Sequence, residues 1–193
     1  PGTKSTIADL LWLRQSGLEA AICQQVARGC ILFGICGGYQ MLGTSIRDPQ
    51  GVEAAGVTEV QGMGLLDMDT VFAGEKVQRQ VHGTFGEIPG ALHGLTGLSY
   101  TGYEIHMGRS QRQGDAIQCN GSVYGSYIHG IFDGAGIAQA LVRGLAAKKG
   151  IDPGRLTDFD PERYKQAQYD RLADAVRGGL NMDFVYRVLN REV

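Results

Sequence analysis

The sequence lacks any uninterrupted apolar run of about 18 residues, the length that a membrane-spanning helix requires. It also lacks a surplus of positive charge, because 20 aspartates and glutamates outnumber 18 lysines and arginines and give a net charge of −2. Binding to nucleic acid or to an anionic membrane surface generally needs a basic stretch or face. We therefore expect a protein that has neither nucleic acid nor a membrane as its partner.

Cysteine is scarce, with four residues in the whole chain. Their spacing matches no zinc-binding pattern, and nothing in the sequence is typical of a secretory signal. We therefore expect reduced thiols in the cytoplasm and no metal site. Cys23 falls on an expected helix, and Cys30 and Cys119 fall on expected strands, so these three residues are predicted to serve in packing.

Glycine, by contrast, is abundant, with 30 residues, which is about twice the usual frequency. The glycines are interleaved with apolar segments, and this pattern indicates tight turns and close backbone contacts rather than disorder. With 43% apolar and 20% charged residues, the composition is typical of one soluble globular domain with a substantial core.

Hydrophobic periodicity predicts an α/β chain with a sheet of mixed direction. The expected helices cover residues 6–16, 18–28, 38–46, 137–149, 161–177 and 182–189. The expected strands cover residues 30–35, 65–72, 77–85, 100–109, 116–119 and 122–128, and residues 47–63 are expected to form a loop. Asn120-Gly121 is a strong tight-turn signal and predicts a hairpin between the last two strands.

One motif stands out between an apolar run and an expected helix. Gly34-Ile35-Cys36-Gly37-Gly38 has the Gly-x-Cys-x-Gly pattern of a nucleophile elbow, with sulfur in place of a serine oxygen. Glycine on each side allows the sharp turn, and the N-terminus of the following helix is expected to favour a thiolate. The alternative is a buried structural cysteine. The strand–turn–helix context favours Cys36 as a nucleophile.

A cysteine nucleophile needs a base, and the sequence offers four histidines. His129 follows the expected strand 122–128, the place where an α/β site would hold a base. His106 lies within another expected strand and is the competing candidate. His82 and His93 are expected at the surface.

Acyl transfer also needs backbone N–H groups that stabilise an oxyanion. The N–H of Gly37 is the natural first donor, and the loop at Gly2 is a candidate for the second. Gln40 lies one helical turn after Cys36, and Arg109 ends an expected strand where it could bind a carboxylate. These features suit an amide substrate that also carries a carboxylate.

The motif around Cys36 resembles the nucleophile signature of the class I (triad) glutamine amidotransferases. Four stretches resemble, more narrowly, the C-terminal glutaminase domain of the cobyric acid synthase family: residues 1–10, 34–40, 102–109 and 124–133. Residues 169–174 also fit, so the resemblance covers essentially the whole chain. The elbow alone indicates only the superfamily. The stretch Tyr-Glu-Ile-His-Met-Gly-Arg, residues 103–109, is what narrows the resemblance to the cobyric acid synthase family. The resemblance implies a flavodoxin-like, three-layer α/β fold with a mixed central sheet.

The resemblance also implies a mechanism. Cys36 would attack the side-chain amide of glutamine to form a γ-glutamyl thioester. His129 would protonate the departing ammonia and then activate water. The residues implied to stabilise the oxyanion or to hold glutamine are Gly2, Gly37, Gln40, Arg109 and His106.

Further expectations concern the longer protein of the family. Ammonia would pass to a synthetase domain that uses ATP and Mg²⁺, whereas the glutaminase domain itself needs no cofactor. The acceptor would be adenosylcobyrinic acid a,c-diamide, amidated at its carboxylates on the route to cobalamin. We expect residues 1–193 to be a glutaminase domain without its first strand and without the N-terminal synthetase domain.

The chain departs from the class I pattern at one position. Many triad amidotransferases carry His-x-Glu, but Ile131 stands two residues after His129. The cobyric acid synthase family is similar in lacking glutamate at this position. The group that orients the imidazole is therefore open, with Asp133 or a residue of another domain as candidates.

Several other functions fit the same residues. A glutaminase subunit of lipid II isoglutaminyl synthase has a similar cysteine, histidine and strand arginine, and cobyrinic acid a,c-diamide synthase is another close relative. A non-catalytic binding domain that keeps the fold, or a cysteine peptidase or esterase with the same elbow, are the alternatives from other classes.

Overall fold

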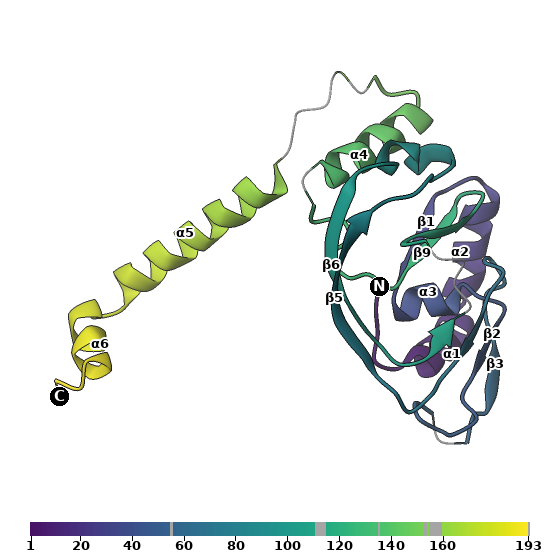
Figure 1. Cartoon of the computed structure of the whole chain (residues 1–193), viewed down its shortest axis with the longest axis horizontal. Coiled ribbons are helices and arrows are strands. Elements are labelled where there is room, and N and C mark those ends of the chain that lie inside the picture. The colour runs from purple at the N-terminus through teal and green to yellow at the C-terminus, as the bar shows by residue number, and fades with distance from the viewer. Residues whose placement is uncertain (55, 111–114, 135, 153, 155–159, 193) are drawn as a thin grey trace. The chain divides into compact units, whose positions relative to one another are not determined.

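In the computed structural model, helices come first, strands interrupted by two short helices follow, and helices end the described part of the chain (Figure 1). The structure describes residues 1–193 except 55, 111–114, 135, 153, 155–159 and 193. The chain divides into two compact units, residues 1–156 and 157–193. We describe each unit by itself.

The first unit contains four α-helices, one 3₁₀-helix and nine strands among its described residues. The helices are α1 (Thr6–Gln15), α2 (Leu18–Ala27), α3 (Gly37–Met41), the 3₁₀-helix η1 (Gly90–Leu95) and α4 (Ile137–Lys148). The strands are β1 (Leu32–Ile35), β2 (Ser45–Arg47), β3 (Glu59–Gln61), β4 (Asp69–Val71), β5 (Val77–Thr84), β6 (Ser99–His106), β7 (Arg109–Ser110), β8 (Gln118–Asn120) and β9 (Val123–Ser126).

Two of the sheets mix parallel and antiparallel pairs, which confirms the predicted mixed α/β class. In the first sheet, of order β1-β9-β8, β1 pairs with β9 in parallel and β8 pairs with β9 as the predicted hairpin. The second sheet has the order β3-β2-β4-β7, in which only β2 and β4 are parallel. The two long strands β5 and β6 form an antiparallel pair of their own. The described strands therefore form three separate sheets.

The segment after the elbow folds differently from the prediction. The helix expected over residues 38–46 ends at Met41, and Ser45–Arg47 forms strand β2 instead. The N–H of Thr44 donates to the carbonyl of Met68 at 2.7 Å, and β2 then pairs on both sides, with β3 and with β4. Pairing with distant strands thus overrides local helix propensity, which is a weak preference.

The loop expected over residues 47–63 contains strand β3, which forms by pairing with β2. The other helices and strands largely follow the hydrophobic pattern, with shorter ends. The expected strand 65–72 is reduced to β4, because only Asp69–Val71 find partners in β2 and β7. The packing role predicted for Cys30 is wrong, since this residue is exposed and lies before β1, with its sulfur 3.6 Å from Gln25 Oε1. Cys23 and Cys119 are partly buried.

Strand β9 and the segment after it are central to the apolar core of the first unit. Apolar side chains from η1 and α4 pack against Tyr124, Ile128 and Ile131, all of which are almost fully buried. A second cluster joins α1 to the β2 region through Ile7, Leu10 and Ile46. Ile35 also packs against the first cluster, so this cluster packs the ends of β1 and β9 where the candidate site lies.

The second unit consists of helices α5 (Pro161–Gly179) and α6 (Met182–Leu189) among its described residues. The Asp160 side chain accepts hydrogen bonds from the N–H groups of Glu162 and Arg163, and this N-cap explains where α5 begins. Both helices were predicted within two residues of their ends. Within the described part of the chain, no helix is both long and apolar enough to cross a membrane.

Candidate active site

The elbow motif forms a strained turn between β1 and α3. Cys36 has a φ of 53° and a ψ of −112°, a conformation that side-chain-bearing residues rarely adopt. The flanking glycines leave no room for a side chain. A Cβ at Gly34 would lie 2.8 Å from Tyr39 Cα, and one at Gly38 would lie 2.8 Å from the Pro1 carbonyl oxygen. The turn therefore has the geometry that the Gly-x-Cys-x-Gly pattern predicts.

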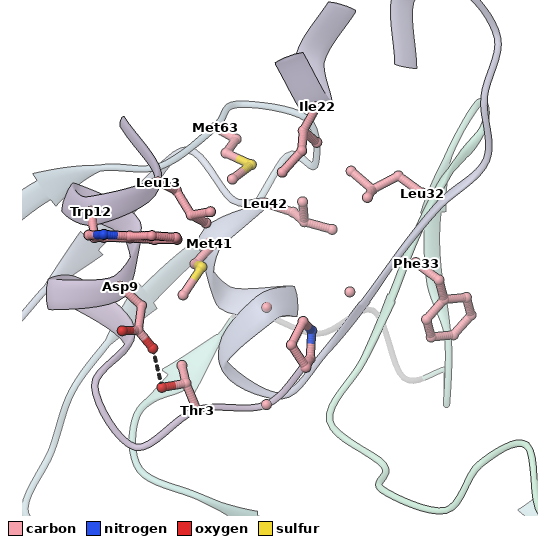
Figure 2. A pocket seen from close by; sticks show the side chains of 14 residues that line it. Thr3, Asp9, Trp12, Leu13, Ile22, Leu32, Phe33, Met41, Leu42 and Met63 are labelled. Carbon is pink, nitrogen blue, oxygen red and sulfur yellow. Dashed lines mark hydrogen bonds between the residues drawn. The ribbon is translucent and has the colours of Figure 1, made fainter. Parts of the chain in front are cut away.

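The N-terminal loop lies directly against this turn. The N–H of Gly38 donates to the Pro1 carbonyl at 3.0 Å, and the Thr3 hydroxyl donates to the carboxylate of Asp9 on α1. Figure 2 shows the bond between Thr3 and Asp9, at the edge of an apolar cavity of about 440 Å³ between α1, α2 and β1. These two contacts hold the residues on each side of Gly2 in place.

Gly2 marks the point where the nucleophile and the base candidate meet. A methyl group added at Gly2 would lie 2.9 Å from His129 Cε1 and 3.3 Å from Cys36 Cβ. Three of the residues singled out from the sequence, Gly2, Cys36 and His129, are therefore neighbours. They come from the loop before α1, the turn after β1 and the segment after β9.

The resting state of the thiol differs from the prediction. Burial raises the pKa of Cys36, and the N–H of Gly37, which favours the thiolate, offsets this effect only in part. Cys36 is 5% exposed, and α3 has only five residues. The predicted preference for a thiolate is therefore wrong for the resting protein, because desolvation outweighs the helix N-terminus.

The protonation state of His129 suits a base that must deprotonate a neutral thiol. It lies three residues after the end of β9, where a two-bond backbone bridge joins it to Tyr103 on β6. Burial lowers the pKa of His129, which keeps the imidazole uncharged and able to accept a proton near neutral pH. The site thus holds an uncharged thiol beside an uncharged base.

A cavity of about 320 Å³ opens at the nucleophile. The Cys36 sulfur lies in its wall, 3.5 Å from the carbonyl oxygen of Ile105. Two of the predicted substrate-binding residues, Gln40 and His106, also line it. The charged residues in its lining are Lys4, Glu53 and Lys76.

The amide of Gln40 is already engaged by the protein. Its nitrogen donates to the Met107 carbonyl at 2.9 Å and to the Tyr127 hydroxyl at 3.2 Å, and its oxygen accepts from the Thr6 hydroxyl at 3.2 Å. Gln40 is buried, so these bonds fix it as part of the cavity wall. It joins α3, α1 and the end of β6 around the cavity.

His106 and Arg109 are placed differently from each other. The His106 ring stacks on Tyr127, with ring centres 3.8 Å apart, and its side chain is 7% exposed within the cavity wall. The Arg109 side chain is 70% exposed and forms an ion pair with Glu75. Among the described residues that line the cavity, Arg109 is absent, so the structure does not bring it to Cys36.

Glu53 is a site residue that the sequence did not reveal. One carboxylate oxygen accepts from the N–H of Ile7 at 3.2 Å, whereas the other is buried without a hydrogen-bond partner among the described residues. Burial raises the pKa of Glu53, and the N–H groups of Ile7 and Thr6 and the Thr6 hydroxyl oppose this shift. A buried carboxylate oxygen without a donor is costly unless a ligand supplies one.

The loop that carries Glu53 is organised by a second acid. Asp48 is almost fully buried and accepts hydrogen bonds from the N–H groups of Val52, Glu53 and Ala54 at 2.8 to 3.0 Å. The sequence predicts the turn at residues 48–51. It does not predict the position of the Glu53 side chain, which depends on contacts with α1.

The usual third member of a class I triad has no counterpart among the described residues. Ile131 is 1% exposed and belongs to the apolar core. Asp133 is tied to the turn, where its N–H donates to the Gly130 carbonyl. In the part of the chain that the structure describes, no carboxylate is hydrogen-bonded to the His129 ring. No cluster of three or more potential metal ligands occurs there either.

Comparisons with known proteins agree with this geometry. Residues 1–137 match the model of the CobB/CobQ-like glutamine amidotransferase domain family. The whole chain aligns with the cobyric acid synthase of Lachnoclostridium phytofermentans at 45% identity, and with that of Ruminiclostridium cellulolyticum at 41% identity. The chain spans 42% and 41% of the lengths of these two relatives.

A solved glutamine amidotransferase structure aligns with 78% of this chain and 77% of its own, at 21% identity and a TM-score of 0.48. The family match covers more than two thirds of the chain, and the nucleophile turn lies inside it. The chain therefore belongs to the family of CobB/CobQ-like glutamine amidotransferase domains.

Proposed function

We propose that this chain hydrolyses L-glutamine and supplies ammonia to the rest of a cobyric acid synthase. The observation that carries the proposal is the meeting of Cys36, on its strained turn, with Gly2 and the uncharged His129. Membership of the glutamine amidotransferase domain family supports the same reading. The alternatives of a binding domain or a peptidase gain no support from the relatives, which carry the name cobyric acid synthase.

The first half of the reaction forms a thioester. His129 takes the proton of Cys36, and the sulfur attacks the amide carbon of the glutamine side chain. The N–H groups of Gly37 and Gly2 stabilise the oxyanion. The protonated His129 then gives its proton to the nitrogen, the C–N bond breaks, and ammonia leaves.

The second half releases glutamate. His129 takes a proton from water, and the resulting hydroxide attacks the thioester carbon. The C–S bond breaks, and the proton on His129 returns to the sulfur of Cys36. The enzyme ends in its starting state, and one water has been consumed for each ammonia and glutamate formed.

The cavity offers opposite charges to the two ends of the amino acid. The buried oxygen of Glu53 suits the α-ammonium group, because an ammonium supplies the donor that this oxygen lacks. Lys4 and Lys76 in the cavity lining are the cations available for the α-carboxylate, and Arg109, which pairs with Glu75 outside the lining, is a third candidate. Gln40 and His106 form the wall along the side chain of the substrate.

The remaining steps belong to the longer protein. We propose that the ammonia passes to an N-terminal synthetase domain that uses ATP and Mg²⁺, as the resemblance implies. Its acceptor would be a corrinoid, adenosylcobyrinic acid a,c-diamide, amidated at its peripheral carboxylates. The supporting observation is that curated relatives of this name are more than twice as long as the aligned region.

The proposal is tested by glutamate release from the intact protein with Cys36→Ala. We expect the rate to fall by at least about a thousandfold, because no other group can form the thioester. Cys30→Ala is the matched control, since Cys30 is an exposed thiol outside the site, and it should keep the wild-type rate. Unchanged release by Cys36→Ala would refute the proposal.

A further inference from the structure

The catalytic role proposed for His129 raises the question of what orients its ring. A catalytic imidazole must present one nitrogen to the nucleophile, and a carboxylate commonly holds it in that orientation. Here the position two residues on is the buried Ile131, and no described carboxylate is hydrogen-bonded to the ring. The lowered pKa of His129 is caused by burial and not by a charged neighbour.

The backbone of His129 is fixed to strand β6. Its N–H donates to the Tyr103 carbonyl at 2.8 Å, and the N–H of Tyr103 donates to the His129 carbonyl at 3.1 Å. The strand can approach this closely because residue 102 is glycine. A Cβ there would lie 2.3 Å from the His129 carbonyl oxygen. The two bonds fix the backbone of His129 but leave its side-chain torsions free.

The side chain of Tyr103 supplies the second restraint. Its ring lies nearly parallel to the imidazole, with 5° between the planes and 5.0 Å between the ring centres, which is an offset-stacked pair. Tyr103 is 46% exposed, because it lies on the face of β6 that points away from the apolar core. An aromatic ring placed at the surface against one histidine contributes little to the core.

We propose that Tyr103 is the positioning residue of His129, in the place that a carboxylate holds in the class I triad. Stacking restricts rotation of the imidazole, so that its edge stays directed at the region between Gly2 and Cys36. The aromatic face also stabilises the imidazolium that forms during each half-reaction, as a cation–π contact does. This inference rests on the proposed function, in which His129 is the base.

The inference assigns the role to the ring and not to the hydroxyl. Among the described residues, no hydrogen bond to the Tyr103 hydroxyl is found, whereas the ring contact is nearly parallel. A phenylalanine should therefore replace tyrosine without loss. A leucine keeps the bulk and the strand but cannot stack.

The test compares Tyr103→Phe with Tyr103→Leu in the intact protein, measured as glutamate release. We expect Tyr103→Phe to keep kcat within about twofold and Tyr103→Leu to lower it about 10- to 100-fold, with KM changed less than about threefold. Thr101→Ala is the control for strand β6, since Thr101 is exposed two residues away and should keep wild-type kinetics. A wild-type kcat for Tyr103→Leu would overturn the inference, and so would an equal loss in Tyr103→Phe.

A second measurement does not depend on activity. In protein with isotope-labelled histidine and Cys36→Ala, the ring current of Tyr103 should move the His129 ring protons upfield. Tyr103→Phe should keep this shift, and Tyr103→Leu should remove it. If Tyr103→Leu does not fold, the wild-type spectrum decides, because an unshifted His129 signal would overturn the inference.

The two proposals fail in different ways. If Cys36→Ala still releases glutamate, the proposed function is wrong whatever Tyr103 does. If Cys36→Ala is inactive but the ring-current shift is absent, the glutaminase reading stands and only the role of Tyr103 is lost.

Discussion

The reacting centre and the cavity beside it are built in different ways. Five consecutive residues, 34–38, form the turn that presents Cys36, and their glycines are required by contacts within 3 Å. The cavity is instead assembled from α1, α3, β6 and the loops that carry Glu53 and Lys76. The comparison teaches that local sequence specifies the nucleophile, whereas long-range packing decides what the nucleophile meets.

The largest loss of activity is expected when the proposed base, His129, is replaced. His129→Ala should lower glutamate release by at least about a thousandfold, because His129 is the histidine that lies with Cys36 against Gly2 in the described part of the chain. His106→Ala is the matched control and should keep measurable activity, since its ring stacks on Tyr127 in the cavity wall. If His106→Ala is the more damaging change, the two histidines exchange roles.

The next effect concerns the loop that closes the reacting centre. Gly2→Ala should lower kcat about a hundredfold, because the added methyl would meet His129 Cε1 at 2.9 Å and displace the ring. Gly17→Ala provides a comparison, since nothing lies within 4 Å of an added methyl there, although its φ of 78° makes a modest loss of stability expected. A Gly2→Ala protein with wild-type kcat would show that His129 does not lie against this loop.

A smaller effect shows whether Glu53, which lines the cavity, or Arg109, which the sequence predicted, contributes more to glutamine binding. Glu53→Gln should raise KM for glutamine about 10- to 100-fold, because a charge-assisted hydrogen bond to the α-ammonium group is lost. Arg109→Ala should raise KM less than about threefold, since the Arg109 side chain is 70% exposed and paired with Glu75. If Arg109→Ala has the larger effect, the α-carboxylate reaches Arg109 and the prediction from the sequence is the better one.

The smallest effect is the pH dependence. The pKa of His129 lies below the usual value of 6.5, and protonated His129 cannot accept the proton of Cys36. The acid limb of kcat/KM should therefore have its midpoint below pH 6.5, where half of His129 is protonated. A midpoint clearly above pH 6.5 would mean that a negative group, absent among the described contacts of the ring, stabilises the imidazolium.

The same contrast explains what the sequence could reveal. The elbow, the hairpin at Asn120-Gly121 and the helices α4 to α6 depend on local signals, and the structure agrees with them. The thiolate preference failed because burial of Cys36 is a property of the packed fold. The helix expected over residues 38–46 failed for a similar reason, since β2 forms only when β3 and β4 are beside it.

Glu53 and Tyr103 could not be identified from local patterns. Glu53 lies in a predicted loop, and its buried oxygen depends on the contact with the start of α1. Tyr103 occurs in the stretch that carries the family resemblance, but its stacking on His129 requires the bridge between β6 and the segment after β9. Both roles arise from pairs of residues that are far apart in the sequence.

The most direct test of the central claim is covalent labelling of the intact protein by a glutamine-like electrophile, followed by peptide mass spectrometry. The account predicts one adduct, on Cys36, that excess glutamine prevents. The exposed Cys30 and the partly buried Cys23 and Cys119 serve as internal controls in the same sample. An adduct on any of these three, with Cys36 unmodified, would contradict the account.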